Sequence, residues 1–111
     1  MAFSHLFGSP LRGPVGVSSS TLSQGVELEP VSDTIQLFTV MGEAPVCVEL
    51  PPLSASAGFY FLIRNQGQAL DPDLHITTQL TKLDTLPPRT VGLYACDGIC
   101  WHLVLRVQDP T

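Results

Sequence analysis

The chain has 111 residues, a length typical of one domain with a single hydrophobic core. Hydrophobic residues make up 44% of it, which excludes a disordered chain, and no apolar run approaches the roughly 18 residues of a membrane-spanning helix. Five basic and ten acidic residues give a net charge of −5, and the basic residues are scattered, which disfavours direct binding to nucleic acid. Only 14% of residues are charged, below the usual share, which indicates that other protein covers much of the surface.

Residues 1–24 differ from the rest of the chain. Glycine and proline interrupt this segment repeatedly, and its apolar residues follow neither a strand nor a helix period. We predict an extended N-terminal arm, with a disordered tail as the alternative. An arm that docks on another surface is favoured by its large apolar residues, which solvated tails rarely carry: Phe3, Leu6, Phe7 and Leu11. We expect no secretory signal, because the first residues have no basic flank and no continuous apolar block.

From residue 25 onward, short apolar segments bounded by turn residues recur, which predicts an all-β domain over residues 25–111. This number of short strands in so few residues predicts a single β-sandwich or jelly-roll-like domain. The segment 82–88 is ambiguous and is predicted to be a loop. The predicted strands cover residues 26–28, 34–40, 46–50, 58–65, 74–78, 90–96 and 99–107.

The segment 58–65 is apolar on both of its expected faces. Phe61 and Ile63 share one face of a strand, whereas Tyr60 and Leu62 share the other. Strands that are half-solvated usually alternate apolar with polar residues. This segment is therefore predicted to be a central strand, or a strand that also meets a partner chain.

The last two predicted strands form the clearest local motif. Asp97-Gly98 between two β-rich runs predicts a two-residue type I′ turn, which needs a positive φ at both positions. That register pairs Tyr94 with Trp101 and places both on one face of the hairpin, together with Cys96, Ile99 and Leu103. The aromatic pair makes this face the predicted core side.

The three cysteines are the first candidates for chemistry, but their pattern favours structural roles. The predicted hairpin sends Cys96 and Cys100 to opposite faces, and no nearby set of Cys and His completes a zinc site with them or with Cys47. We therefore predict buried free thiols, no metal and no cofactor.

Other constellations are also weak. The spacing Asp71-x-Asp73-x-His75 could hold a cation, but Pro72 favours a turn with solvated carboxylates. There is no nucleophile elbow and no glycine-rich phosphate loop in the sequence, so we predict that the protein is not an enzyme.

Three segments carry a resemblance to a known class of proteins: VCVELP at 46–51, AGFYFLIRN at 57–65 and VGLYACDGICW at 91–101. With these segments, residues 25–105 resemble a β-module found in the virion proteins of tailed bacteriophages. The shared pattern is one of packing and turns, not of chemistry. The chain departs from it over residues 71–86, where the module has a second ladder.

Such modules occur in tail fibres, baseplates and capsid decoration proteins, and this short chain with one domain and a short arm is most similar to a decoration (cement) protein. The resemblance implies a non-enzymatic homotrimer that assembles in the host cytoplasm, clamps neighbouring major capsid proteins on the virion surface and stabilises the head. The alternative is a tail fibre or baseplate component that binds a host-surface receptor. Partner contacts would come from the arm, through Phe3, Leu6, Phe7 and Leu11, and, between protomers, from Tyr60, Leu62, His102 and Val104.

Overall fold

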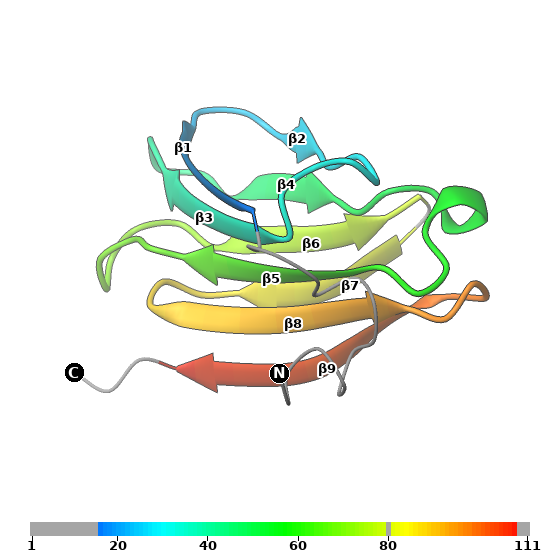
Figure 1. The fold of residues 1–111 in the computed structure, drawn as a ribbon. Helices are drawn as coiled ribbons and strands as arrows, with labels where there is room; N and C mark the ends of the chain where they lie inside the picture. The colour runs from blue at the N-terminus through cyan, green and yellow to red at the C-terminus, as the bar shows by residue number, and fades with distance from the viewer. Residues whose placement is uncertain (1–15, 80, 109–111) are drawn as a thin grey trace.

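The structure is a computed structural model that describes residues 16–79 and 81–108 (Figure 1). These residues form an all-β fold, and none of their helices is long or apolar enough to cross a membrane. The elements are β1 (Val17–Leu22), β2 (Val26–Glu27), β3 (Ile35–Val40), β4 (Val46–Glu49), the short 3-10 turn η2 (Leu53–Ala55), β5 (Tyr60–Asn65), β6 (Leu74–Thr78), β7 (Thr81–Leu86), β8 (Thr90–Cys96) and β9 (Trp101–Gln108).

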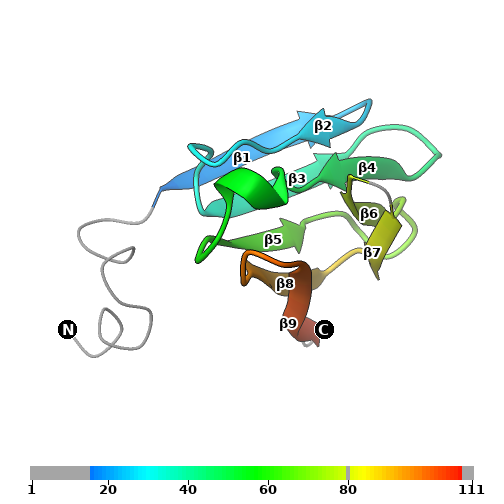
Figure 2. The same cartoon turned by 90° about the vertical axis from the view of Figure 1, so that its right-hand side faces the viewer.

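The strands form two mixed sheets. Sheet A has the order β1-β3-β5-β8-β9, and sheet B has the order β2-β4-β6-β7. The first six strands alternate between the two sheets, so the chain forms one strand of the other sheet before it comes back to the same sheet. Successive strands of one sheet are therefore parallel over this part of the chain. Figure 2 shows this as paired levels, with β1 beside β2, β3 beside β4 and β5 beside β6. Jelly rolls are built from antiparallel strands, so the jelly-roll connectivity is not confirmed.

The core lies between the two sheets, because their strands bury alternate residues. β3 and β5 both show the period-2 burial pattern of a sheet with one buried face. One continuous cluster joins the inward side chains of both sheets. Its members include Phe38, Val40, Phe61, Ile63, Tyr94 and Trp101 from sheet A, and Val46, Val48, Leu74, Ile76 and Leu86 from sheet B.

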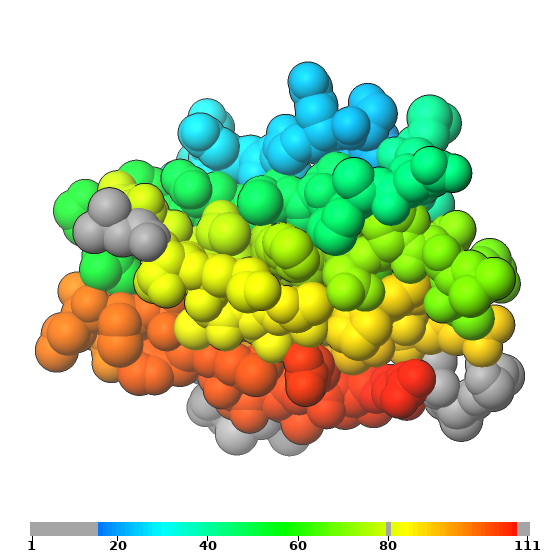
Figure 3. Space-filling model, turned by 180° about the vertical axis from the view of Figure 1, so that it is seen from behind, coloured from blue at the N-terminus to red at the C-terminus, as the bar shows by residue number. Residues whose placement is uncertain are grey.

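A polar network joins the two sheets along one edge. The Tyr94 hydroxyl on β8 donates a hydrogen bond to Asp84 Oδ2 on β7 at 2.8 Å, and Arg106 Nη1 on β9 donates to Asp84 Oδ1 at 2.9 Å. Burial, reinforced by the Asp84 carboxylate, raises the pKa of Tyr94 far above its ordinary value, so the hydroxyl stays a neutral donor. Seen from behind in Figure 3, β7 (yellow) lies directly above β9 (red) at this edge.

Two strands occupy segments that the sequence prediction placed elsewhere. Residues 17–22, assigned to the arm, form β1, because their backbone pairs in parallel with β3 over six residues. The predicted loop at 82–88 is also wrong over most of its length, since β7 pairs antiparallel with β6. Residues 1–15, the remainder of the predicted arm, lie outside the described residues.

The predicted two-residue turn at Asp97-Gly98 is wrong. Gly98 has a φ of 92°, as one position of such a turn requires. Asp97 does not have a positive φ, because among the described non-glycine residues only Arg89 has one. The type I′ requirement is therefore not met. The hairpin instead closes through a four-residue loop, residues 97–100, with Cys96 opposite Trp101. Because this register differs from the predicted one by two residues, it preserves the faces from Trp101 to Leu103. The register shift between Leu93 and Tyr94 changes them beyond Leu103, so that Leu105 and not Val104 shares a face with His102.

The face predictions for the hairpin are confirmed in part. Tyr94 and Trp101 are both buried, as predicted. Cys96 is also buried on this face, whereas Leu103 pairs with Tyr94 but is 39% exposed. Ile99 was expected on the same face, but it lies in the loop and is 80% exposed. A residue in the loop no longer follows the alternation of the strand, which is why the prediction failed there.

Candidate functional site

The outward face of sheet A carries an uninterrupted row of apolar side chains. The strand registers place one residue of each strand side by side across the whole sheet. On each of the first four strands these residues alternate with more buried neighbours, so they point away from the core. This outer apolar row consists of Val17, Ile35, Leu62, Leu93 and Leu105.

The apolar surface extends beyond the row. The neighbouring row on the same face, two residues away on each strand, contains Leu37, Val91 and Val107, with Arg64 between Leu37 and Val91. At the two edges of the sheet the side chains are most open, with Val17 56% and Leu105 54% exposed. Five strands at about 4.8 Å spacing give a width of roughly 19 Å, which suits the dry centre of a protein interface.

Three of the four strand residues predicted to contact a neighbouring protomer meet on this face. Leu62 is in the outer apolar row, and Tyr60 and His102 lie in the adjacent row, because both pair with Ala95. Leu62 and Tyr60 are half-buried, and His102 is exposed. Val104 falls at the register shift between β8 and β9, has no cross-strand partner there and is 57% exposed. The predicted arm contacts, Phe3, Leu6, Phe7 and Leu11, lie outside the described residues.

The strands of sheet A also lack negative charge. None of the five contains an aspartate or glutamate, although the chain has ten acidic residues and a net charge of −5. Their cationic side chains are Arg64 and Arg106, and Arg106 is directed to Asp84 and to the Thr85 carbonyl of its own chain. Two copies that meet through this face would therefore bring few like charges together.

The loop between β8 and β9 is organised by one carboxylate. Asp97 Oδ1 accepts hydrogen bonds from the backbone amides of Ile99 at 2.8 Å and Cys100 at 2.9 Å. This arrangement leaves Asp97 Oδ2 directed at His102 Nε2, 2.8 Å away. Hydrogen bonds from the Cys100 amide, from His102 and from the Ile99 amide hold the pKa of Asp97 well below its usual range, so the carboxylate is ionised.

Cys100 completes a cluster with these two side chains. Its Sγ lies 3.3 Å from His102 Nε2, and the donor atoms of Asp97, Cys100 and His102 all lie within 4.8 Å of one another. No other group of three or more His, Cys, Asp or Glu side chains in the described part of the chain is arranged so that it could hold a metal ion. The hairpin that carries it is the orange loop at the right of Figure 1.

The geometry of this cluster does not fit a nucleophilic triad. In such a triad the carboxylate orients one ring nitrogen of the histidine, while the other ring nitrogen takes the proton of the nucleophile. Here Asp97 and Cys100 both approach Nε2 of His102. Three donor atoms that converge on one point are instead the arrangement of metal ligands.

The sequence did not identify this cluster because the predicted hairpin was too tight. In a four-residue loop, Cys100 leaves the strand and approaches both Asp97 and His102. The prediction of three buried free thiols is confirmed for Cys96, but Cys47 and Cys100 are exposed. Cys47 is therefore an exposed thiol outside the cluster.

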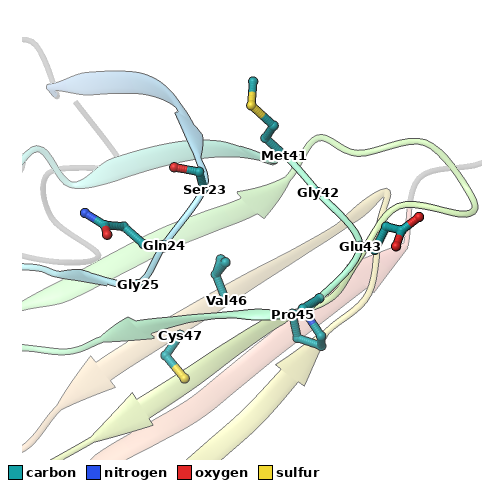
Figure 4. A pocket seen from close by; sticks show the side chains of 10 residues that line it. Ser23, Gln24, Gly25, Met41, Gly42, Glu43, Pro45, Val46 and Cys47 are labelled. Atoms are coloured by element: carbon teal, nitrogen blue, oxygen red, sulfur yellow. The ribbon is translucent and has the colours of Figure 1, made fainter.

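A shallow depression of about 460 Å³ lies between the loops that follow β1 and β3 (Figure 4). The exposed Met41 and the strand residues Val46 and Cys47 line it, and its one charged side chain is Glu43. A small-molecule site usually combines an enclosed apolar cavity with several convergent polar groups. This depression does not have that combination.

Comparisons of the chain with protein-family models, with curated proteins and with solved structures find no significant match.

Proposed function

We propose that this chain is a non-enzymatic virion protein that assembles into a homotrimer and decorates a phage head as a cement protein. The observation that carries the proposal is the apolar outer face of sheet A. The capsid placement rests on the resemblance to phage virion modules described above, and the face supplies the self-association that such a protein needs.

The occupant of this face is a second copy of the chain. A standard interface buries about 800 Å² on each partner, with an apolar centre and few charges. The outer apolar row supplies that centre, and the absence of acidic residues from the strands of sheet A removes the main source of repulsion between two copies of an acidic protein. Three sheets that face a common threefold axis would bury the row in a closed assembly.

The first test is the mass in solution. Light scattering on the full chain is expected to give about 36 kDa, three times the 12.0 kDa of one chain. Leu105→Arg places a cation in the row at a position that is 54% exposed, so the protomer keeps its fold. Loss of about 2 kcal/mol per interface, roughly 30-fold, is expected to shift the mass towards 12.0 kDa.

Leu70→Arg is the matched control, because Leu70 is fully exposed and lies away from the strands of sheet A. This variant is expected to keep the mass of the unaltered chain. A monomer at all concentrations, or an equal loss of assembly in both variants, would refute the role of the face.

The arm is proposed to anchor the trimer to the head. A segment of 15 residues can extend over roughly 50 Å, enough to reach a capsid subunit from a trimer, and three arms engaged at once would strengthen retention by about 10²- to 10⁴-fold. Deletion of residues 1–12, which removes Phe3, Leu6, Phe7 and Leu11, is therefore expected to abolish co-sedimentation with undecorated heads of the encoding phage. The mass in solution should still correspond to a trimer.

Unchanged occupancy on the heads after this deletion would remove the arm from the mechanism. A trimer that ignores heads but adsorbs to host cells would instead favour the receptor-binding alternative. Most of the described aromatic residues give that alternative little support, because Tyr94 and Trp101 are buried and the Tyr60 hydroxyl lies beneath the surface. Phe59, which is 40% exposed, is the aromatic side chain that such a receptor site could use.

A further inference from the structure

We propose that Asp97, Cys100 and His102 form a binding site for a single divalent metal ion of the zinc class. The site lies in the loop between β8 and β9 and at the start of β9, and all three ligands come from one chain. It goes beyond the proposed structural function and does not depend on it.

The donor atoms lie close to the separations that a tetrahedral ion requires, with one pair closer together by about 0.5 Å. Zinc bonds of about 2.0–2.3 Å place neighbouring ligand atoms roughly 3.3–3.6 Å apart. Cys100 Sγ and His102 Nε2 are 3.3 Å apart, His102 Nε2 and Asp97 Oδ2 are 2.8 Å apart, and no donor pair exceeds 4.8 Å. An ion can therefore enter between the three atoms with small movements of side chains alone.

The loop holds the ligands in place before an ion binds. Because Asp97 Oδ1 accepts two backbone amides, the carboxylate is fixed and its other oxygen is left for the ion. The loop is further tied to β8, since the Gly98 amide donates to Cys96 Sγ at 3.4 Å. Hydrogen bonds that orient a ligand in this way raise metal affinity in known sites.

The chemistry of the donors selects the ion. One thiolate, one imidazole and one carboxylate form a borderline-soft set that suits zinc and disfavours magnesium and calcium, which take oxygen ligands. All three residues are exposed in the single chain, so an ion bound there would have its fourth position open to water. Binding would replace the proton of the Cys100 thiol with the ion.

The test is a titration of the full chain, reduced and freed of metal by chelation, with Co²⁺ and then Zn²⁺. We expect one Co²⁺ per chain and an absorption band from thiolate-to-cobalt charge transfer. Cys100→Ser should abolish the band, and both Cys100→Ser and His102→Ala should weaken Zn²⁺ binding in calorimetry by at least about 10-fold. Cys47→Ser is the matched control, because Cys47 is also exposed but lies on β4, and it should change neither result.

The Leu105→Arg variant separates this site from the assembly. Because the three ligands belong to one chain, this variant should still bind one ion per chain even where it is monomeric. The proposal is overturned if the band survives Cys100→Ser, if Cys47→Ser removes it equally, or if the metal binds only to the assembled form.

Discussion

Trp101→Ala is expected to lower the free energy of unfolding by about 3–5 kcal/mol, the range for the loss of a large aromatic side chain from a core. Trp101 is 4% exposed at the start of β9, and its ring centroid lies 6.0 Å from that of Phe61 on β5. Its indole Nε1 donates a hydrogen bond to the carbonyl oxygen of Pro51 at 2.9 Å, which ties β9 to the segment after β4. Truncation therefore removes both a packed ring and the connection between two distant segments.

The measurement is urea denaturation followed by circular dichroism, because Trp101 is the only tryptophan and its fluorescence is lost in the variant. Trp101→Phe keeps a ring against Phe61 but removes the bond to Pro51, so a smaller loss of about 1–2 kcal/mol is expected. Leu70→Ala, at a fully exposed position, should change stability by less than about 0.5 kcal/mol. A loss below about 1 kcal/mol for Trp101→Ala would contradict the packing described for this residue.

Asn65→Leu is expected to destabilise the protein by about 3 kcal/mol or more, although it adds apolar surface at a fully buried position. Asn65 Nδ2 donates to the carbonyl oxygens of Pro72 and Leu86, both at 3.1 Å, and Oδ1 accepts from the Gly67 amide at 3.0 Å. One side chain at the end of β5 thus connects sheet A to the segment before β6 and to the last residue of β7. Leucine would leave three backbone groups without these partners, each at a cost of about 1–3 kcal/mol.

The same denaturation experiment measures this effect, with Gln66→Leu as the control. Gln66 is the next residue along the chain, but it is exposed, so the same kind of substitution should cost less than about 0.5 kcal/mol. Equal stability of Asn65→Leu and the unaltered chain would mean that the amide does not connect the two sheets. A destabilised Gln66→Leu would mean that leucine at this turn, and not the lost hydrogen bonds, is responsible.

Local sequence patterns were sufficient for the strands that pack one face on the core. Residues 35–40, 60–65 and 90–96 alternate between more and less buried positions, and the sequence predicted strands in all three places. The period of 2 also predicted that Tyr94 and Trp101 face inward, and the two-residue error in register did not alter that.

β1 and β7 show where local patterns failed. The serine run in β1 is typical of a flexible segment. It nevertheless forms a strand, because its backbone pairs with β3. β7 contains both Lys82 and Asp84, which a buried strand rarely does. β7 is the edge strand of sheet B, where Lys82 is exposed. The Asp84 carboxylate forms an ion pair with Arg106, which lies 22 residues further along the chain.

The all-β class, most of the strands and the inward faces could thus be predicted from local sequence, because these depend on residues one or two positions apart. The strand order, the outer apolar row and the cluster of Asp97, Cys100 and His102 could not be predicted in this way and were found only in the folded chain. The row needs the register between strands that are far apart in the chain. The cluster needs a loop conformation that the Asp97 carboxylate stabilises through two backbone amides. Both depend on contacts that form only when the whole chain is folded, so no local pattern specifies them.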